Sequence, residues 1–211
     1  INKVIESVKP DLILVHGDTT TSFSASLAAF YNKVSVGHVE AGLRSNSLYS
    51  PWPEEGNRNL ISKLSTIHFA PTNEARQNLI EENVVSENIY VTGNSVIDTL
   101  HITLEKIRTT DNIAIKIRKS IESLNLKQKY ILVTGHRREN FGTGFENICK
   151  ALKKIAEKNP TIDIVYPVHL NPNVRKIINK RLDNISNIKL IEPLDYYEFI
   201  TLMASSYFIL T

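Results

Sequence analysis

Two carboxylates follow the first two apolar runs of the chain. Asp18 comes just after the run Asp11–Val15, and Glu40 directly follows the run Val34–Val39. Because the carboxyl ends of parallel strands meet at one edge of a sheet, we expect the two side chains to lie close together. A pair of carboxylates in different surroundings is what a reaction needs if it removes a proton and returns it. The pattern therefore indicates acid–base chemistry.

Each carboxylate also has a purely structural interpretation. Asp18 precedes a predicted helix and could simply cap it. Glu40 could pair with Arg44, four residues later. A third carboxylate, Glu54, opens another predicted helix, where the helix dipole favours an acidic first turn whatever its role. Trp52, between two prolines, would form a stiff apolar wall beside it.

The spacing of histidines and carboxylates also raises the possibility of a metal site. The pairs His16-x-Asp18 and His38-x-Glu40 each place two ligand types on one face of an extended chain. No further group stands out that would orient these ligands, as metal sites require. The sequence therefore predicts no metal.

The second half of the chain contains a candidate anion site. The loop 134–144 holds His136, Arg137, Arg138 and three glycines between a predicted strand and a predicted helix. Such a loop suits phosphate groups, although it is neither a Walker loop nor a dinucleotide-binding glycine motif. The alternative is an exposed polar loop. His169 follows a later strand, and its structural alternative is a hydrogen bond within its own loop.

These residues sit in an alternation of short apolar runs and helical stretches. Continuous apolar strands that alternate with helices predict parallel sheets in an α/β fold. A polar helical stretch, 94–129, divides the alternation, so we expect two Rossmann-like domains, residues 1–98 and 99–211. The remaining strands are expected at Ile67–Ala70, Ile89–Thr92, Tyr130–Val133, Ile162–Val168, Ile188–Ile191 and Phe208–Leu210, and the helices at Thr19–Tyr31, Glu54–Leu64, Thr72–Asn83, Phe145–Lys158, Val174–Leu182 and Tyr196–Ala204.

Composition excludes several classes of protein. The 211 residues carry a net charge of +3, which is too small to indicate a nucleic-acid partner. No apolar run reaches the ~18 residues that a membrane-spanning helix needs. The single cysteine, Cys149, cannot form an internal disulfide, which favours a reducing compartment and a cytoplasmic protein. Its periodic apolar surroundings predict a core position.

Five motifs, in this order along the chain, resemble those of the bacterial non-hydrolysing UDP-N-acetylglucosamine 2-epimerases. The resemblance extends over essentially all 211 residues, and five motifs together are far more specific than any one alone. The motifs are His16-Gly17-Asp18-Thr19, His38-Val39-Glu40-Ala41-Gly42-Leu43-Arg44, Pro53-Glu54-Glu55-x-Asn57-Arg58, Gly135-His136-Arg137-Arg138-Glu139-Asn140 and Val168-His169-Leu170-Asn171-Pro172-Asn173.

The resemblance implies a GT-B-like fold with the active site in the cleft between two Rossmann-like domains. It implies interconversion of UDP-GlcNAc and UDP-ManNAc for cell-surface polysaccharide synthesis, with no cofactor, by elimination and re-addition of UDP in a homodimeric enzyme. Asp18, Glu40 and Glu54 would be the acid–base set. His136 would stabilise the diphosphate leaving group, and His136 and Arg137 would bind substrate. Glu54, Arg137 and His169 would border a second, allosteric UDP-GlcNAc site.

The sequence also departs from this family. Gly56 stands where relatives usually carry a larger apolar residue, which weakens the helix slightly. Family segments that precede Ile1 and follow Thr211 are absent, so we expect both domains to be truncated and the chain by itself to have little activity. Three other functions remain open at this point: a hydrolysing relative that releases ManNAc and UDP, a GT-B glycosyltransferase, and a non-catalytic remnant that acts as a binding or assembly partner.

Overall fold

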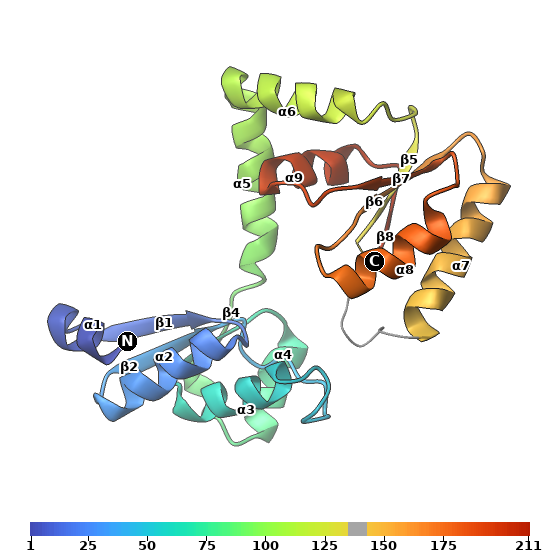
Figure 1. Cartoon of the computed structure of the whole chain (residues 1–211). Coiled ribbons are helices and arrows are strands. Elements are labelled where there is room, and N and C mark those ends of the chain that lie inside the picture. The colour runs from blue at the N-terminus through green and yellow to red at the C-terminus, as the bar shows by residue number, and fades with distance from the viewer. Residues whose placement is uncertain (135–142) are drawn as a thin grey trace. The chain divides into compact units, whose positions relative to one another are not determined.

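The computed structural model describes residues 1–134 and 143–211, which divide into two compact units. Residues Ile1–Ile97 form the first unit and residues Asp98–Thr211 the second. Each contains one four-stranded parallel sheet with helices between the strands (Figure 1). The α/β class that the alternation predicts is therefore present in both halves of the chain.

The first unit follows the predicted elements to within a residue or two. It also contains a short N-terminal helix, α1 (Asn2–Val8), that the apolar pattern does not reveal, because Ile5 alone is buried in it. The other elements are β1 (Leu12–His16), α2 (Thr20–Tyr31), β2 (Ser35–Val39), α3 (Glu54–Leu64), β3 (Ile67–Ala70), α4 (Asn73–Glu81), the 3₁₀ turn η1 (Ser86–Asn88) and β4 (Ile89–Val91).

Threonine side chains cap two of these helices. The Thr19 hydroxyl accepts a hydrogen bond from the Ser22 amide at 3.1 Å, and Thr72 accepts one from the Ala75 amide at 3.0 Å. A side-chain oxygen at this position satisfies an amide that has no partner within the helix. Thr19 therefore caps α2, the interpretation of Asp18 as the cap is wrong, and the Asp18 carboxylate is left for other contacts.

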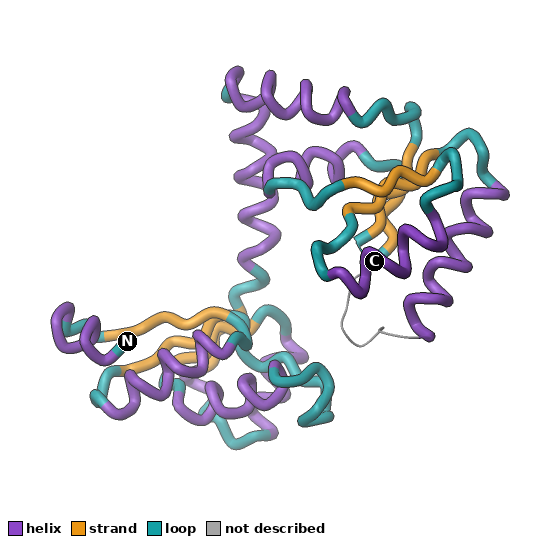
Figure 2. Tube along the Cα trace, in the orientation of Figure 1, coloured by secondary structure: helices purple, strands orange, loops and turns teal. Residues whose placement is uncertain are grey.

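The strands of the first sheet follow one another in the order β1-β2-β3-β4. Because each crossover steps in the same direction and such crossovers are right-handed, α2, α3 and α4 all cover the same face. Figures 1 and 2 show the three helices on one side of this sheet. Two core clusters lie beneath them, one around Val15, Val36 and Ile61 and one around Ala70 and Leu79.

The opposite face of the first sheet is apolar and is not covered by any described helix of this unit. Leu14 is 61% exposed and Tyr90 is 54% exposed. Leu14 and the Phe69 ring meet over Gly37, where a Cβ would lie only 2.6 Å from the Leu14 side chain. Phe69 in turn packs beside Tyr90, with ring centroids 6.1 Å apart. We call Leu14, Phe69 and Tyr90 the bare face.

The second unit reverses direction within its sheet. The strand order is β7-β6-β5-β8, so the chain moves from β5 outward to β7 and then returns to the other side of β5. A right-handed crossover in the reverse direction places its helix on the opposite face. The elements are α5 (Ser95–Thr109), α6 (Asp111–Ser123), β5 (Tyr130–Val133), α7 (Thr143–Lys158), β6 (Asp163–Pro167), α8 (Pro172–Leu182), β7 (Ile188–Ile191), α9 (Tyr196–Ser205) and β8 (Phe208–Leu210).

Both faces of this second sheet are therefore buried. One core, which includes Phe145, Leu152 and Tyr166, lies under α7 and α8. The other, around Leu132 and Leu202, lies under α6 and α9. Cys149 of α7 is buried in the first of these cores, as predicted, and burial raises the pKa of its thiol.

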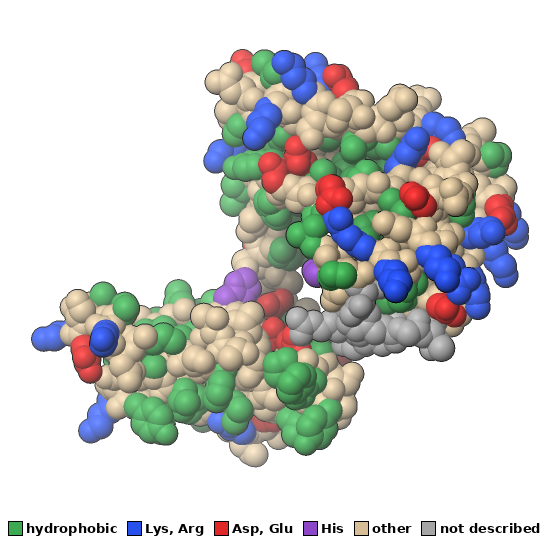
Figure 3. All heavy atoms as spheres, viewed as in Figure 1, with side chains coloured by type: hydrophobic (Ala, Val, Ile, Leu, Met, Phe, Trp, Pro, Cys, Tyr) green, Lys and Arg blue, Asp and Glu red, His purple; other side chains and the backbone are tan. Residues whose placement is uncertain are grey.

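Basic side chains are concentrated on the second unit. Lysine and arginine side chains gather over the second unit on the face that Figure 3 shows. Many come from α7 and α8, which carry Lys150, Lys153, Lys154, Lys158, Lys176, Lys180 and Arg181. Within the described ranges, no helix is both long enough and apolar enough to cross a membrane.

The bare face generates a first prediction. We expect the 211-residue chain to self-associate through this face, because burying a large apolar side chain stabilises an interface by ~1.5–3 kcal/mol. The double variant Leu14→Lys with Tyr90→Lys should weaken self-association roughly tenfold or more, as measured by light scattering against concentration. The control is Val85→Lys with Ile115→Lys, which adds the same charge at other exposed positions. Equal effects of the two double variants would contradict the prediction.

Candidate active site

The turns after β1 and β2 bring Asp18 and Glu40 to the same edge of the first sheet. The two strands pair in parallel, with His16 opposite Val39, so both chains leave the sheet at the same level. The Gly17 amide donates to the Val39 carbonyl at 3.0 Å and joins the two turns. The expectation that the strand order places these carboxylates at one edge is met by the observed register.

Both turns require an unusual backbone. Gly17 has φ of 68°, which glycine adopts at little cost, and Glu40 has φ of 67°. A glutamate in this left-handed region is uncommon, and such conformations persist where the surroundings impose them, often at functional sites. A Cβ on Gly17 would lie 3.3 Å from Glu40 Oε2, so the Glu40 carboxylate extends over Gly17.

Helix α3 holds Asp18 from the other side. Arg58 donates to Asp18 Oδ2 through Nε at 2.9 Å and lies 2.7 Å from it through Nη2. Asn57 donates from Nδ2 to the Asp18 carbonyl at 2.8 Å. The guanidinium and the amide together fix both the carboxylate and the backbone of Asp18, and Arg58 compensates its charge.

Arg58 is itself oriented by a buried carboxylate. Its Nη1 donates to Glu55 Oε2 at 3.0 Å, and Glu55 is only 2% exposed. The same oxygen accepts from the Ser45 amide at 3.1 Å. A buried charge with an opposite charge and a further hydrogen bond is tolerated, whereas an unpaired one is costly. Glu55, Asn57 and Arg58 therefore form the support of Asp18.

These supporting residues do not stand out individually in the sequence, although they lie in the motif Pro53-Glu54-Glu55-x-Asn57-Arg58. The available signal is their spacing. Glu55 and Arg58 are three residues apart and share one face of α3. What the sequence does not show is that this face points to Asp18, forty positions earlier.

Glu40 lies beside His16 and makes no ion pair with Arg44. Its Oε2 is 3.5 Å from His16 Nε2. Arg44 instead forms a two-pronged pair with Glu82, at 2.5 Å from Nε and 2.8 Å from Nη2. The pairing of Glu40 with Arg44, one of the two sequence interpretations, is therefore wrong. The hydrogen bonds from Arg44 hold the pKa of Glu82 below its usual range.

Glu54 is on α3 but outside this network. It is in the first turn and partly buried, and it makes no hydrogen bond or ion pair with the described residues. Because it precedes Arg58 by four residues, it lies on the face of α3 that carries Arg58 toward Asp18. The structure thus places Glu54 on the same side of the helix as the Asp18 contact, without a direct contact to either carboxylate.

Two histidines lie side by side beneath this edge. His38 of β2 and His68 of β3 are register partners, 1% and 2% exposed. His38 Nε2 is 2.9 Å from the Gly17 carbonyl. Burial lowers the pKa of His38 to about 4 and also lowers that of His68, and nearby Arg44 acts in the same direction.

The metal alternative finds no support in this geometry. His16 lies beside Glu40, Asp18 is paired with Arg58, and His38 bonds to a backbone carbonyl, so the four candidates do not converge on one point. Within residues 1–134 and 143–211, no three His, Cys, Asp or Glu side chains are arranged to hold an ion.

The predicted site residues of the second unit are only partly described. His169 follows β6, and its Nδ1 accepts a hydrogen bond from the Asn171 amide at 3.1 Å. This is the hydrogen bond within its own loop that the structural alternative predicts. His136 and Arg137 lie outside the described residues. The strand that precedes them, β5, lies between β6 and β8, so the strand order reverses at its end. Ligands of doubly wound sheets bind at this switch point.

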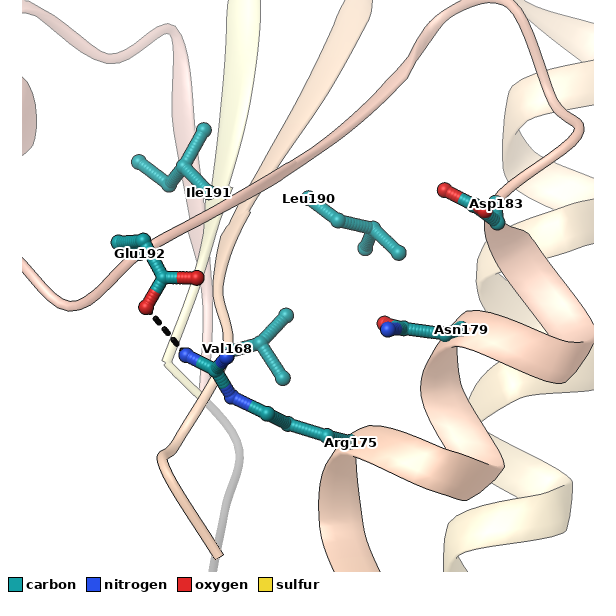
Figure 4. Close-up of a pocket in the computed structure, with 7 residues that line it drawn as sticks. All are labelled: Val168, Arg175, Asn179, Asp183, Leu190, Ile191 and Glu192. Carbon is teal, nitrogen blue, oxygen red and sulfur yellow. Dashed lines mark hydrogen bonds and ion pairs between the residues drawn. The ribbon is translucent and has the colours of Figure 1, made fainter. Parts of the chain in front are cut away.

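The described part of the second unit also contains a small pocket (Figure 4). Its volume is about 140 Å³, below the ~300 Å³ at which ligand pockets begin. Arg175 and Glu192 pair across it. The other lining residues are Val168, Asn179, Asp183, Leu190 and Ile191. This pocket is too small for a nucleotide sugar.

Comparison with known proteins shows the family of this chain. All residues, 1–211, match the family model for UDP-N-acetylglucosamine 2-epimerase. This chain belongs to that family. It is 53% identical over 211 residues to the UDP-N-acetylglucosamine 2-epimerase of Salmonella typhimurium and 55% identical over 214 residues to that of Campylobacter jejuni. Each alignment includes 100% of this chain and 56% of the relative.

A solved relative has the same fold. The crystal structure of UDP-GlcNAc 2-epimerase from Neisseria meningitidis bound to UDP-GlcNAc is 51% identical to this chain, with a TM-score of 0.91. The match covers 99% of this chain and 56% of that protein. The predicted class, a GT-B-like α/β protein with Rossmann-like sheets, is confirmed. This chain spans about half the length of these relatives.

The support of Asp18 generates a second prediction. Arg58→Met should lower the free energy of unfolding by roughly 1–3 kcal/mol, because it leaves Asp18 and buried Glu55 without their shared partner. Urea denaturation followed by circular dichroism measures the change. Arg76→Met is the control, since Arg76 is a partly exposed arginine whose side-chain hydrogen bond to Ser86 lies at the surface. Comparable losses in both variants would show that the Arg58 network contributes no more than a surface contact.

A third prediction concerns acid. The folded-state pKa of His38 is below that of the unfolded chain, so the unfolded state binds more protons and stability should fall as pH drops from 6.5 toward 4. The titratable and charged groups that face His38 are His68, Arg44 and Asp18.

The test compares urea midpoints at pH 7.5, 6.0 and 5.0. His38→Gln should reduce the dependence on pH, because glutamine does not titrate, and the exposed His101→Gln is the matched control. A His38→Gln variant with the full wild-type slope would show that His38 does not titrate in this range.

Proposed function

We propose that the protein to which this chain belongs interconverts UDP-GlcNAc and UDP-ManNAc as a UDP-GlcNAc 2-epimerase. The observation that carries the proposal is the pair of carboxylates, Asp18 and Glu40, at the ends of two adjacent strands. Family membership supports the same reaction. The Neisseria meningitidis relative binds UDP-GlcNAc, which supports the substrate class.

The reaction must invert a carbon that holds a poorly acidic proton. No carbonyl adjoins C2 of the sugar ring in a way that would acidify it. Cleavage of the bond between C1 and the UDP oxygen puts positive character on C1 and makes the C2 proton removable. A carboxylate takes that proton, UDP leaves with the bonding electron pair, and a C1–C2 double bond forms. Return of a proton to the opposite face of C2 and of UDP to C1 gives the epimer.

The proposed roles follow from this sequence of steps. Asp18, Glu40 and Glu54 form the acid–base set, which has to act on both faces of C2. Asp18 is paired with Arg58, whereas Glu40 lies beside His16. These different surroundings suit two carboxylates with different tasks. His136 stabilises the departing diphosphate, and His136 and Arg137 bind substrate. Glu54, Arg137 and His169 border a second, regulatory substrate site.

The proposal favours epimerisation without net hydrolysis. A hydrolysing relative would let water trap the intermediate and release ManNAc and UDP. Product analysis separates the two outcomes, because only epimerisation returns a UDP-linked sugar. We also propose that the full-length protein is a cytoplasmic homodimer. The resemblance supports the dimer, and the single, buried Cys149 is consistent with a reducing compartment.

The fourth prediction tests the carboxylates in the full-length protein. Asp18→Asn and Glu40→Gln should each lower turnover roughly 100-fold or more, the usual effect of losing a positioned acid or base. The assay follows incorporation of deuterium at C2 of UDP-GlcNAc in D₂O by NMR. Glu74→Gln, an exposed carboxylate on α4, is the control.

Three outcomes bear on the proposal. Near-normal exchange in both site variants would reject the acid–base assignment. Free ManNAc as the main product of the unmodified protein would replace epimerisation by hydrolysis. Charge-assisted hydrogen bonds to a nucleotide sugar each add ~1.5–3 kcal/mol. Because the 211-residue chain spans only 56% of the length of its relatives, we expect it by itself to make fewer of these bonds, to bind UDP-GlcNAc weakly and to exchange little.

A further inference from the structure

His38 is a buried imidazole that the proposed acid–base chemistry leaves without a role. It lies on β2, two residues before Glu40, and is 1% exposed. Its Nε2 is 2.9 Å from the carbonyl of Gly17, the residue before Asp18. The side chain therefore connects the two turns that carry the proposed acid–base carboxylates.

The hydrogen-bond geometry determines the tautomer of His38. A carbonyl oxygen can only accept, so Nε2 carries the proton and donates it to Gly17. Nδ1 is buried and has no partner among the described residues. A buried N–H without an acceptor is costlier than a lone pair without a donor, so Nδ1 carries no proton. His38 is thus neutral, with its proton on Nε2.

The surroundings of His38 keep it neutral. His68 occupies the paired position on β3, and its own Nδ1 is likewise buried without a hydrogen-bond partner in the part of the chain that the structure describes. Burial and the nearby Arg44 guanidinium both disfavour a positive charge on His38. The Asp18 carboxylate favours such a charge, but its effect is the smallest of these. The hydrogen bond to Gly17 therefore has the same donor throughout the physiological pH range.

The Gly17 peptide is held to β2 at both of its polar groups. Its amide donates to the Val39 carbonyl at 3.0 Å, and its carbonyl accepts from His38. The Glu40 carboxylate extends over the same residue, 3.3 Å from where a Cβ would be. The position of Gly17 therefore sets how Asp18 and Glu40 lie relative to each other.

We propose that His38 is a positioning residue, whose Nε2–H holds the Gly17 carbonyl and thereby fixes the spacing between the Asp18 and Glu40 carboxylates. The effect on catalysis rests on the proposed epimerase function; the hydrogen bond itself does not. Loss of the bond leaves both carboxylates present but lets the Gly17 turn shift. Displacement of a catalytic group by ~1 Å can cost roughly 100-fold in rate.

A pair of conservative variants tests the role in the full-length protein. Glutamine places its amide nitrogen close to the position of Nε2, whereas asparagine is one methylene shorter and does not reach. We expect His38→Asn to lower kcat roughly 10- to 100-fold with KM changed less than about threefold, and His38→Gln to keep at least about a third of kcat. His68→Asn, in the same buried layer but not bonded to Gly17, should lose stability and keep most of its kcat.

A second measurement uses the 211-residue chain and needs no activity. The ¹⁵N shifts of the His38 ring should show a protonated Nε2 and an unprotonated Nδ1, unchanged from pH 8 to pH 6. A proton on Nδ1, or equal losses of kcat in His38→Asn and His38→Gln at equal stability, would overturn the proposal. If the unmodified full-length protein shows no C2 exchange, the proposed function fails, and the role of His38 in that reaction fails with it. The ring shifts then still decide whether the hydrogen bond to Gly17 exists.

Discussion

The parallel pairing of β1 with β2 is the constraint on which the candidate site depends. With His16 opposite Val39, both strands end at the same level, and neighbouring strands lie only ~4.8 Å apart. Asp18 and Glu40 follow within two residues of these ends. A shift of one residue in register would move the carboxylates apart and would also turn the core-facing Val15 and His38 to the other face. Burial of that face therefore enforces the register that brings Asp18 and Glu40 to one edge.

Helix α3 adds charge compensation to this arrangement. It is attached to the sheet through Ile61, which is fully buried in the core beneath it. From this anchored helix, Asn57 and Arg58 reach Asp18, and Glu55 orients Arg58. Buried charges of this kind add little net stability, but they hold specific side chains in one geometry. The network is thus better understood as orientation of the site than as a source of stability.

The two units differ in how their helices cover the faces of their sheets. In the first, every crossover runs in one direction, so its described helices cover one face and leave Leu14, Phe69 and Tyr90 bare. In the second, the return to β8 covers both faces and creates a switch point at the end of β5. The first unit thus carries Asp18 and Glu40 at one sheet edge, and in the second unit the switch point, where sheets of this type receive ligands, lies at the end of β5.

Local sequence determined a large part of this protein. Apolar periodicity, the capping residues Thr19 and Thr72, and turn glycines such as Gly17 specify elements that lie within a residue or two of their predicted bounds. The placement of Asp18 and Glu40 just after strands was also visible, because it depends only on neighbouring residues. The sequence did not predict the short helix α1, because a single buried residue leaves no periodic apolar pattern.

Only the tertiary structure decided which partners these residues take. Arg44 pairs with Glu82, Arg58 with Asp18 and His38 with Gly17, across separations of 38, 40 and 21 residues. Such contacts depend on strand order and on which helix face turns inward, and no local spacing encodes either. His136 and Arg137 remain predictions from the sequence. For the described residues, the chain by itself specified where the reactive groups stand along each element, and the packing of distant elements specified what holds them there.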